Sequence, residues 1–183
     1  MTDKQKHTKD RLAKAGLPKN MLNVTPETDG VFDLTQWKSY MRMEEKNAAR
    51  VRVRNCTFEG DDMLLTARCA AKICLDAFPS VTAISFWNVF QSACNSPADF
   101  YNLYDTPLLL IEDFPVSEKG GWSEMFPERK TFYFIEDMIK RRTDDGLPTF
   151  LQTDGKLGVN FSAWWRKSLY NRFAPTCHTV TSK

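Results

Sequence analysis

The sequence has few of the residues that build disulfide scaffolds and metal centres. Its 183 residues include five cysteines, no two of them spaced as C-x-x-C, and two histidines, His7 and His178. An odd number of cysteines without paired spacing argues against a disulfide framework, and so few histidines argue against a zinc site. We therefore expect no metal site in this protein.

The sequence also lacks long apolar runs and a large excess of either positive or negative charge. No apolar run approaches the roughly 20 residues of a membrane-spanning helix, and the polar start, Met1 to Lys6, has no secretory signal behind it. Lys and Arg number 25 against 23 Asp and Glu, a net charge of +2, far below that of a histone-like protein. These absences predict a cytoplasmic protein with no membrane partner.

The residues that are present suffice for one folded domain. Apolar residues make up 42% and aromatic residues 13% of the chain, which is ample material for a core. Residues 1–33 form a polar lead-in that we expect to be a solvated arm or a short helix. Residues 34–183 are expected to form a single α/β domain.

Strand-like and helix-like segments alternate along that domain. Expected helices cover residues 34–50, 63–78, 89–93, 128–142 and 161–173, and expected strands cover 51–54, 80–87, 106–114, 147–153 and 176–181. This alternation predicts a mostly parallel five-stranded sheet flanked by helices. The four aliphatic residues at 108–111 indicate a central strand that is buried on both faces.

Acidic residues follow two of these strands. Glu112 and Asp113 come directly after the aliphatic run, and Asp154 follows the strand that ends at Thr153. Two acids after an aliphatic strand are typical of a Walker B motif, in which one carboxylate holds Mg²⁺ and the other orients the attacking water. The alternative is an acid pair that caps a strand at the surface.

From about residue 51 to 181 the chain resembles the DnaC/DnaI/IstB-like AAA+ ATPases, which are bacterial and phage helicase loaders and transposition accessory subunits. The resemblance rests on the order and spacing of four segments: the Walker B-like strand 108–114, the helix 128–142, the sensor 1-like strand 147–154 and Leu169-Tyr170-Asn171-Arg172-Phe173. It implies a P-loop NTPase-like AAA+ core. It also implies that Arg172 acts as an arginine finger toward a neighbouring subunit, and that the protein works in a bacterial host cell with a replicative helicase or a related AAA+ subunit.

The sequence departs from this family where phosphate would bind. The family has G-x-x-x-x-G-K-[S/T] after its first strand, but here Gly60, Asp61, Asp62 and Met63 stand there, with Asp62 in the place of the lysine. A repulsive charge in place of an attractive one about 4 Å from a phosphate changes the interaction by roughly 8 kcal/mol at an effective dielectric constant near 20, before screening. Asp154 also replaces a family amide that can donate to phosphate. We therefore expect neither ATP nor Mg²⁺ as a cofactor, and no C-terminal lid.

Two further groups of residues are candidates for DNA contacts. In related loaders the region after the second strand faces single-stranded DNA, which implies this role for Phe86, Trp87 and Asn88, whose alternative role is in the core. Lys140, Arg141 and Arg142 could meet phosphate or could compensate the helix dipole. The leading hypothesis is an ATPase-inactive, helicase loader-like accessory protein of DNA replication. The alternatives are an active ATPase with an unconventional phosphate loop, a single-stranded DNA-binding module, and an inhibitor of a host helicase loader.

Overall fold

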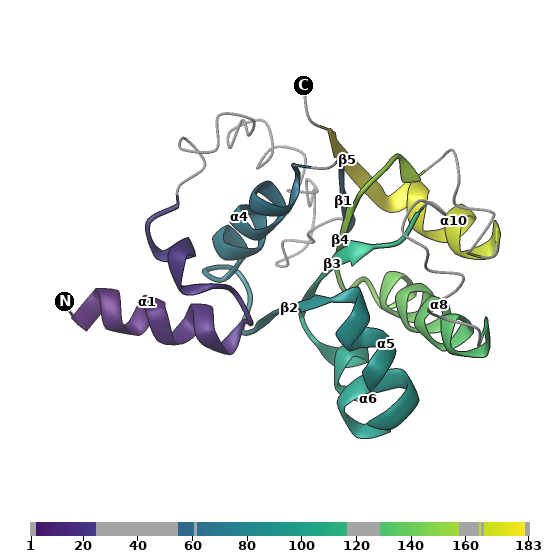
Figure 1. The fold of residues 1–183 in the computed structure, drawn as a ribbon, viewed down its shortest axis with the longest axis horizontal. Coiled ribbons are helices and arrows are strands. Elements are labelled where there is room, and N and C mark those ends of the chain that lie inside the picture. The colour runs from purple at the N-terminus through teal and green to yellow at the C-terminus, as the bar shows by residue number, and fades with distance from the viewer. Residues whose placement is uncertain are drawn as a thin grey trace, which may run out of the picture.

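A computed structural model describes residues 3–24, 55–60, 62–116, 129–157, 165 and 167–181. Its five strands form one sheet in the order β2-β3-β4-β1-β5, and each pair of neighbours runs parallel (Figure 1). The strands are β1 (Asn55–Glu59), β2 (Val81–Ser85), β3 (Leu108–Phe114), β4 (Thr149–Thr153) and β5 (Cys177–Thr181). This sheet confirms the predicted fold class.

Helices cover both faces of the sheet (Figure 1). One face carries α1 (Asp3–Lys14), the short 3-10 helix η1 (Lys19–Leu22) and α4 (Leu64–Cys74). The other carries α5 (Phe86–Asn95), α6 (Pro97–Asp105), α8 (Arg129–Asp144) and α10 (Lys167–Phe173), after which η3 (Ala174–Thr176) leads into β5. Two apolar layers therefore lie on either side of one sheet, as parallel sheets require.

The central strand β3 divides its side chains between the two layers. Leu108 and Leu110 pack toward α4, whereas Leu109 and Ile111 pack toward α5 and α8, and all four are fully buried. This alternation follows from the two-residue period of a strand. The prediction of a central strand buried on both faces is confirmed.

Several element boundaries differ from those expected. Residues 51–54, the expected first strand, and the expected helix 34–50 lie outside the described residues, and β1 begins at Asn55. Phe86 and Trp87 belong to α5 and not to a strand, because the Ser85 side chain caps that helix by accepting from the Asn88 N–H at 3.3 Å. Helix α6 was not expected at all.

The N-terminal segment is a helix, but it is not a solvated arm. Leu12, Ala15 and Met21 are buried against the sheet, and the Ala83 N–H of edge strand β2 donates to the Ala15 carbonyl at 2.7 Å. Gly16 ends α1 with φ +74°, and a Cβ there would lie 2.4 Å from the Ala83 carbonyl oxygen. The segment thus covers a sheet edge that would otherwise expose unpaired backbone groups. The domain boundary at residue 33 lies outside the described residues and stays a prediction.

Candidate functional site

The carboxyl ends of the parallel strands bring the predicted acids to one edge of the sheet. Glu112 and Asp113 close β3, and Asp154 directly follows β4, the neighbouring strand. Their proximity has an electrostatic effect: partial burial and the charge of Glu112 raise the pKa of Asp113, Arg68 opposes that rise, and Asp154 adds to it. The three carboxylates therefore lie close enough together at this edge for their charges to interact.

Glu112 is engaged by an arginine that the sequence analysis did not select. Arg68 of α4 donates from Nε to Oε1 and from Nη2 to Oε2 of Glu112, both at 2.7 Å. The hydrogen bond to Glu112 is the main cause that raises the pKa of Arg68. Arg68 and Lys72 are the only charged residues of α4, and this was the available signal that each has a specific partner.

The backbone around Asp113 is irregular. Asp113 has φ +54°, and the pairing of β3 with β4 shifts register between Ile111 and Phe114. The Asp113 N–H donates to Oε1 of Gln152 at 2.8 Å, which holds the irregularity in place. As a result Phe114 packs in the same apolar layer as Leu109 and Ile111, although alternation alone would place it in the layer of Leu108 and Leu110.

The connection from β1 to α4 spans only Gly60 to Met63, and Asp61 lies outside the described residues. The Gly60 N–H donates to the Thr153 carbonyl at 3.1 Å, so this loop is tied to β4. Met63, which stands where the family has a magnesium-binding hydroxyl, is 1% exposed and belongs to the apolar core. Asp62 is exposed.

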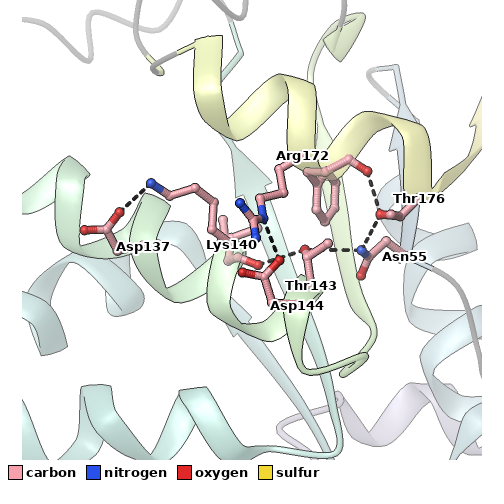
Figure 2. A network of polar contacts seen from close by, with 9 residues as sticks. Asn55, Asp137, Lys140, Thr143, Asp144, Arg172 and Thr176 are labelled. Carbon is pink, nitrogen blue, oxygen red and sulfur yellow. Dashed lines mark hydrogen bonds and ion pairs between the residues drawn. The ribbon is translucent and has the colours of Figure 1, made fainter.

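Arg172 lies on the surface of α10 and is paired within the chain. Its Nε donates to Oδ1 of Asp144 on α8 (Figure 2). Beside this pair, Asn55 donates to Oγ1 of Thr176 at 2.7 Å and of Thr143 at 3.4 Å, which links β1, α8 and η3. Arg172 is half-exposed, so it is available at the surface once Asp144 releases it.

The aromatic candidates for DNA contact separate into two environments. Phe86 is fully buried and contacts Phe114 and Trp165, so the structure contradicts a role for it in binding DNA. Trp87 is 42% exposed and stacks on Phe90 with a centroid distance of 6.3 Å, and Asn88 is exposed. The helical period places residues 86 and 87 on different sides of α5, which explains the difference.

The basic candidates at the end of α8 are all engaged. Lys140 pairs with Asp137 at 2.6 Å, and Arg141 pairs with Asp145 at 3.6 Å. Arg142 is fully buried, so the structure contradicts its proposed contact with DNA.

The Arg142 guanidinium instead connects helix α8 to two other segments of the same chain, residues 103–106 and 148–149. It donates to the carbonyls of Leu103, Tyr104, Thr106 and Pro148 and to the hydroxyl of Thr149. Burial lowers the pKa of Arg142 to about 10, which leaves it charged at neutral pH. Its role is structural because every donor nitrogen has a partner inside the protein.

Across residues 3–24, 55–60, 62–116, 129–157, 165 and 167–181, no group of three or more His, Cys, Asp or Glu residues could hold a metal ion. Within the same described residues, no helix is long and apolar enough to cross a membrane.

The strand order and the helices on both faces define a parallel α/β fold that solved structures share. No protein-family model and no curated protein matches the sequence. Solved structures do match: the DnaC helicase loader has 13% identity and a TM-score of 0.62 over 91% of this chain and 100% of that chain. DnaI has 12% identity and a TM-score of 0.59 over 91% of this chain and 95% of that chain. A primosome component from Streptococcus pyogenes serotype M3 has 14% identity and a TM-score of 0.60 over 92% of this chain and 91% of that chain. At these identities the similarity shows a shared DnaC-like fold.

Proposed function

We propose that this protein is a helicase loader-like accessory protein of DNA replication that acts without hydrolysing ATP. The fold shared with DnaC, DnaI and a primosome component over nearly the whole chain supports the loader-like role. The partner would accordingly be a replicative helicase or a related AAA+ subunit. The cytoplasm of a bacterial cell, where replication takes place, would be its location.

The Arg68–Glu112 pair is the observation that supports action without ATP. A guanidinium that donates to both oxygens of Glu112 supplies the positive charge that Mg²⁺ would supply in a Walker B site. The residues around it do not fit a nucleotide either. The loop from Gly60 to Met63 offers neither a lysine nor a hydroxyl, and Asp62 and Asp154 would face the phosphates with like charge.

Isothermal titration with MgATP and MgADP tests the nucleotide half of this proposal. We expect no saturable binding at millimolar nucleotide and no phosphate release above buffer. The informative variant is Asp113→Asn, which changes one carboxylate and keeps its size. Micromolar MgATP binding by the native protein that disappears in this variant would contradict the proposal and favour an active ATPase with an unconventional loop.

Capture of partners from a bacterial lysate by the immobilised protein tests the other half. We expect a hexameric replicative helicase or an AAA+ subunit, followed by stoichiometric binding of the purified partner. Arg172→Ala should weaken this binding about tenfold, whereas Lys167→Ala, an exposed change on the same helix, should not. Asp144→Ala removes the partner of Arg172 and should leave binding intact or strengthen it. If the bound protein blocks helicase loading onto DNA, it is an inhibitor.

A further inference from the structure

Positive charge is concentrated at the N-terminal end of the described chain. Residues 3–24 hold six of the 25 Lys and Arg residues but only two of the 23 Asp and Glu residues, a net charge of +4. The remaining chain carries 19 basic against 21 acidic residues, a net charge of −2. Residues 3–24 are therefore a basic segment of a chain that is nearly neutral as a whole.

Three lysines of α1 form what we call the α1 lysine face: Lys6, Lys9 and Lys14. At 100° per residue they lie within an arc of about 140°, on the side opposite the buried Leu12 and Ala15. A rise of 1.5 Å per residue separates the Lys6 and Lys14 backbones by about 12 Å along the helix. Two acidic positions of α1, Asp3 and Asp10, also fall within this arc, and Asp10 is the one that lies between the lysines along the helix.

These lysines differ in their pairing from the basic residues that were candidates for a functional site and from Arg68. Arg68, Lys140, Arg141 and Arg172 each pair with a carboxylate, and Arg142 is buried among carbonyls. Among the described residues, Lys6, Lys9 and Lys14 have no ion-pair partner. Their charges are therefore available to an external anion without displacing an internal one.

The face is held rigidly on the body of the protein. The Ala83 N–H of β2 donates to the Ala15 carbonyl, and Arg11 pairs with Asp76 at 2.9 Å. Lys72 of α4 donates to the carbonyls of Met21 and Val24 at 2.6 and 2.7 Å, which anchors the following η1 segment (Figure 1). A fixed array of charges loses less entropy on binding than a free tail would.

We infer that the α1 lysine face binds the sugar–phosphate backbone of DNA, independently of base sequence. A repeating array of phosphates complements several unpaired cations along one helix. The largest apolar residue exposed on α1 is Ala13, so the face has no apolar anchor of the kind that protein interfaces need. The apolar side of α1 is already buried against the sheet, so the helix cannot insert into a lipid surface. This inference does not rest on the proposed loader role.

Fluorescence anisotropy with a labelled 20-nucleotide strand and a 20-base-pair duplex tests the inference on the full chain. Three phosphate contacts predict slopes of log Kobs against log salt near −2 for the single strand and −2.7 for the duplex. Raising KCl from about 50 to 200 mM should then weaken binding about 20-fold and 40-fold, respectively. The absence of salt-dependent binding would refute the inference.

Matched variants separate this face from general electrostatics. Lys6→Gln/Lys9→Gln/Lys14→Gln should lower DNA affinity at least tenfold and flatten the salt slope by about 2 for the single strand. The control Lys130→Gln/Lys156→Gln/Lys167→Gln removes the same charge from exposed lysines elsewhere and should change affinity less than about threefold.

A gain of function is also expected. Asp10→Asn removes the carboxylate that lies between these lysines along α1 and should strengthen DNA binding about two- to fivefold. Lys6, Asp10 and Lys14 are exposed and Lys9 is half-buried, so glutamine and asparagine at these positions should keep α1 folded, which circular dichroism checks. Equal losses in both triple variants, or weaker binding by Asp10→Asn, would overturn the assignment. It would also be overturned if the triple variant of α1 lost a captured protein but bound DNA normally.

Discussion

Replacing Arg68 by alanine would leave Glu112 as a buried carboxylate without its partner. The two hydrogen bonds between these side chains are 2.7 Å long, and the side chains are 26% and 9% exposed. Removal of one partner from a fully buried ion pair costs about 3–5 kcal/mol. Because water reaches part of the Arg68 side chain, we expect Arg68→Ala to lower the free energy of unfolding by about 2–3 kcal/mol.

The complementary changes show whether this cost comes from the pair. Glu112→Gln leaves Arg68 charged but able to turn toward water, and it should cost about 1 kcal/mol. The double variant removes the uncompensated charge. It should therefore be more stable than the sum of the single losses predicts, with a coupling energy of about 1–2 kcal/mol.

Urea unfolding at neutral pH, followed by circular dichroism, measures all three variants. Asp76→Ala, which breaks the exposed Arg11–Asp76 pair, is the control and should cost less than about 0.5 kcal/mol. A loss no larger than that of Asp76→Ala, or a coupling energy of zero, would refute the reasoning.

Three further predictions concern positions where the structure is most constrained, and urea unfolding checks each. Arg142→Met should cost about 4 kcal/mol because its hydrogen-bond partners stay buried, whereas the exposed Arg141→Met should cost less than about 1 kcal/mol. Gly146→Ala should lower the free energy of unfolding by about 1 kcal/mol, because of its φ of +70° alone. Gly16→Ala should lower it by about 3 kcal/mol, because its Cβ would also meet the Ala83 backbone. Equal losses in the two variants would contradict this reasoning. Because its surroundings raise the pKa of Asp113, its charge destabilises the folded state above that pKa. Asp113→Asn should therefore raise the free energy of unfolding by about 0.3 kcal/mol at pH 7, and by nothing below pH 3.8, the ordinary pKa of an aspartate. A gain in stability that persists in acid would contradict this explanation.

Much of the architecture could be predicted from local patterns. The aliphatic run at 108–111 indicated a central strand, and the alternation of segments indicated a parallel sheet, because side-chain periodicity reflects which faces of an element are buried. The meeting of Glu112 and Asp113 with Asp154 followed from the same pattern, since parallel strands end at one edge. By contrast, helix α6 and the packing of α1 were missed, as both bury short apolar sets among many polar residues.

The sequence by itself determined that strands alternate with helices and that acids follow two of the strands, since these features depend on neighbours a few residues apart. Only the tertiary structure decided which charges are neutralised. Arg68 binds Glu112, which lies 44 positions further along the chain. Arg142 lies in the last turn of its helix, where basic residues are common, but it is buried because it donates to carbonyls near residue 104. Such pairings depend on how whole elements pack, and no local period encodes them.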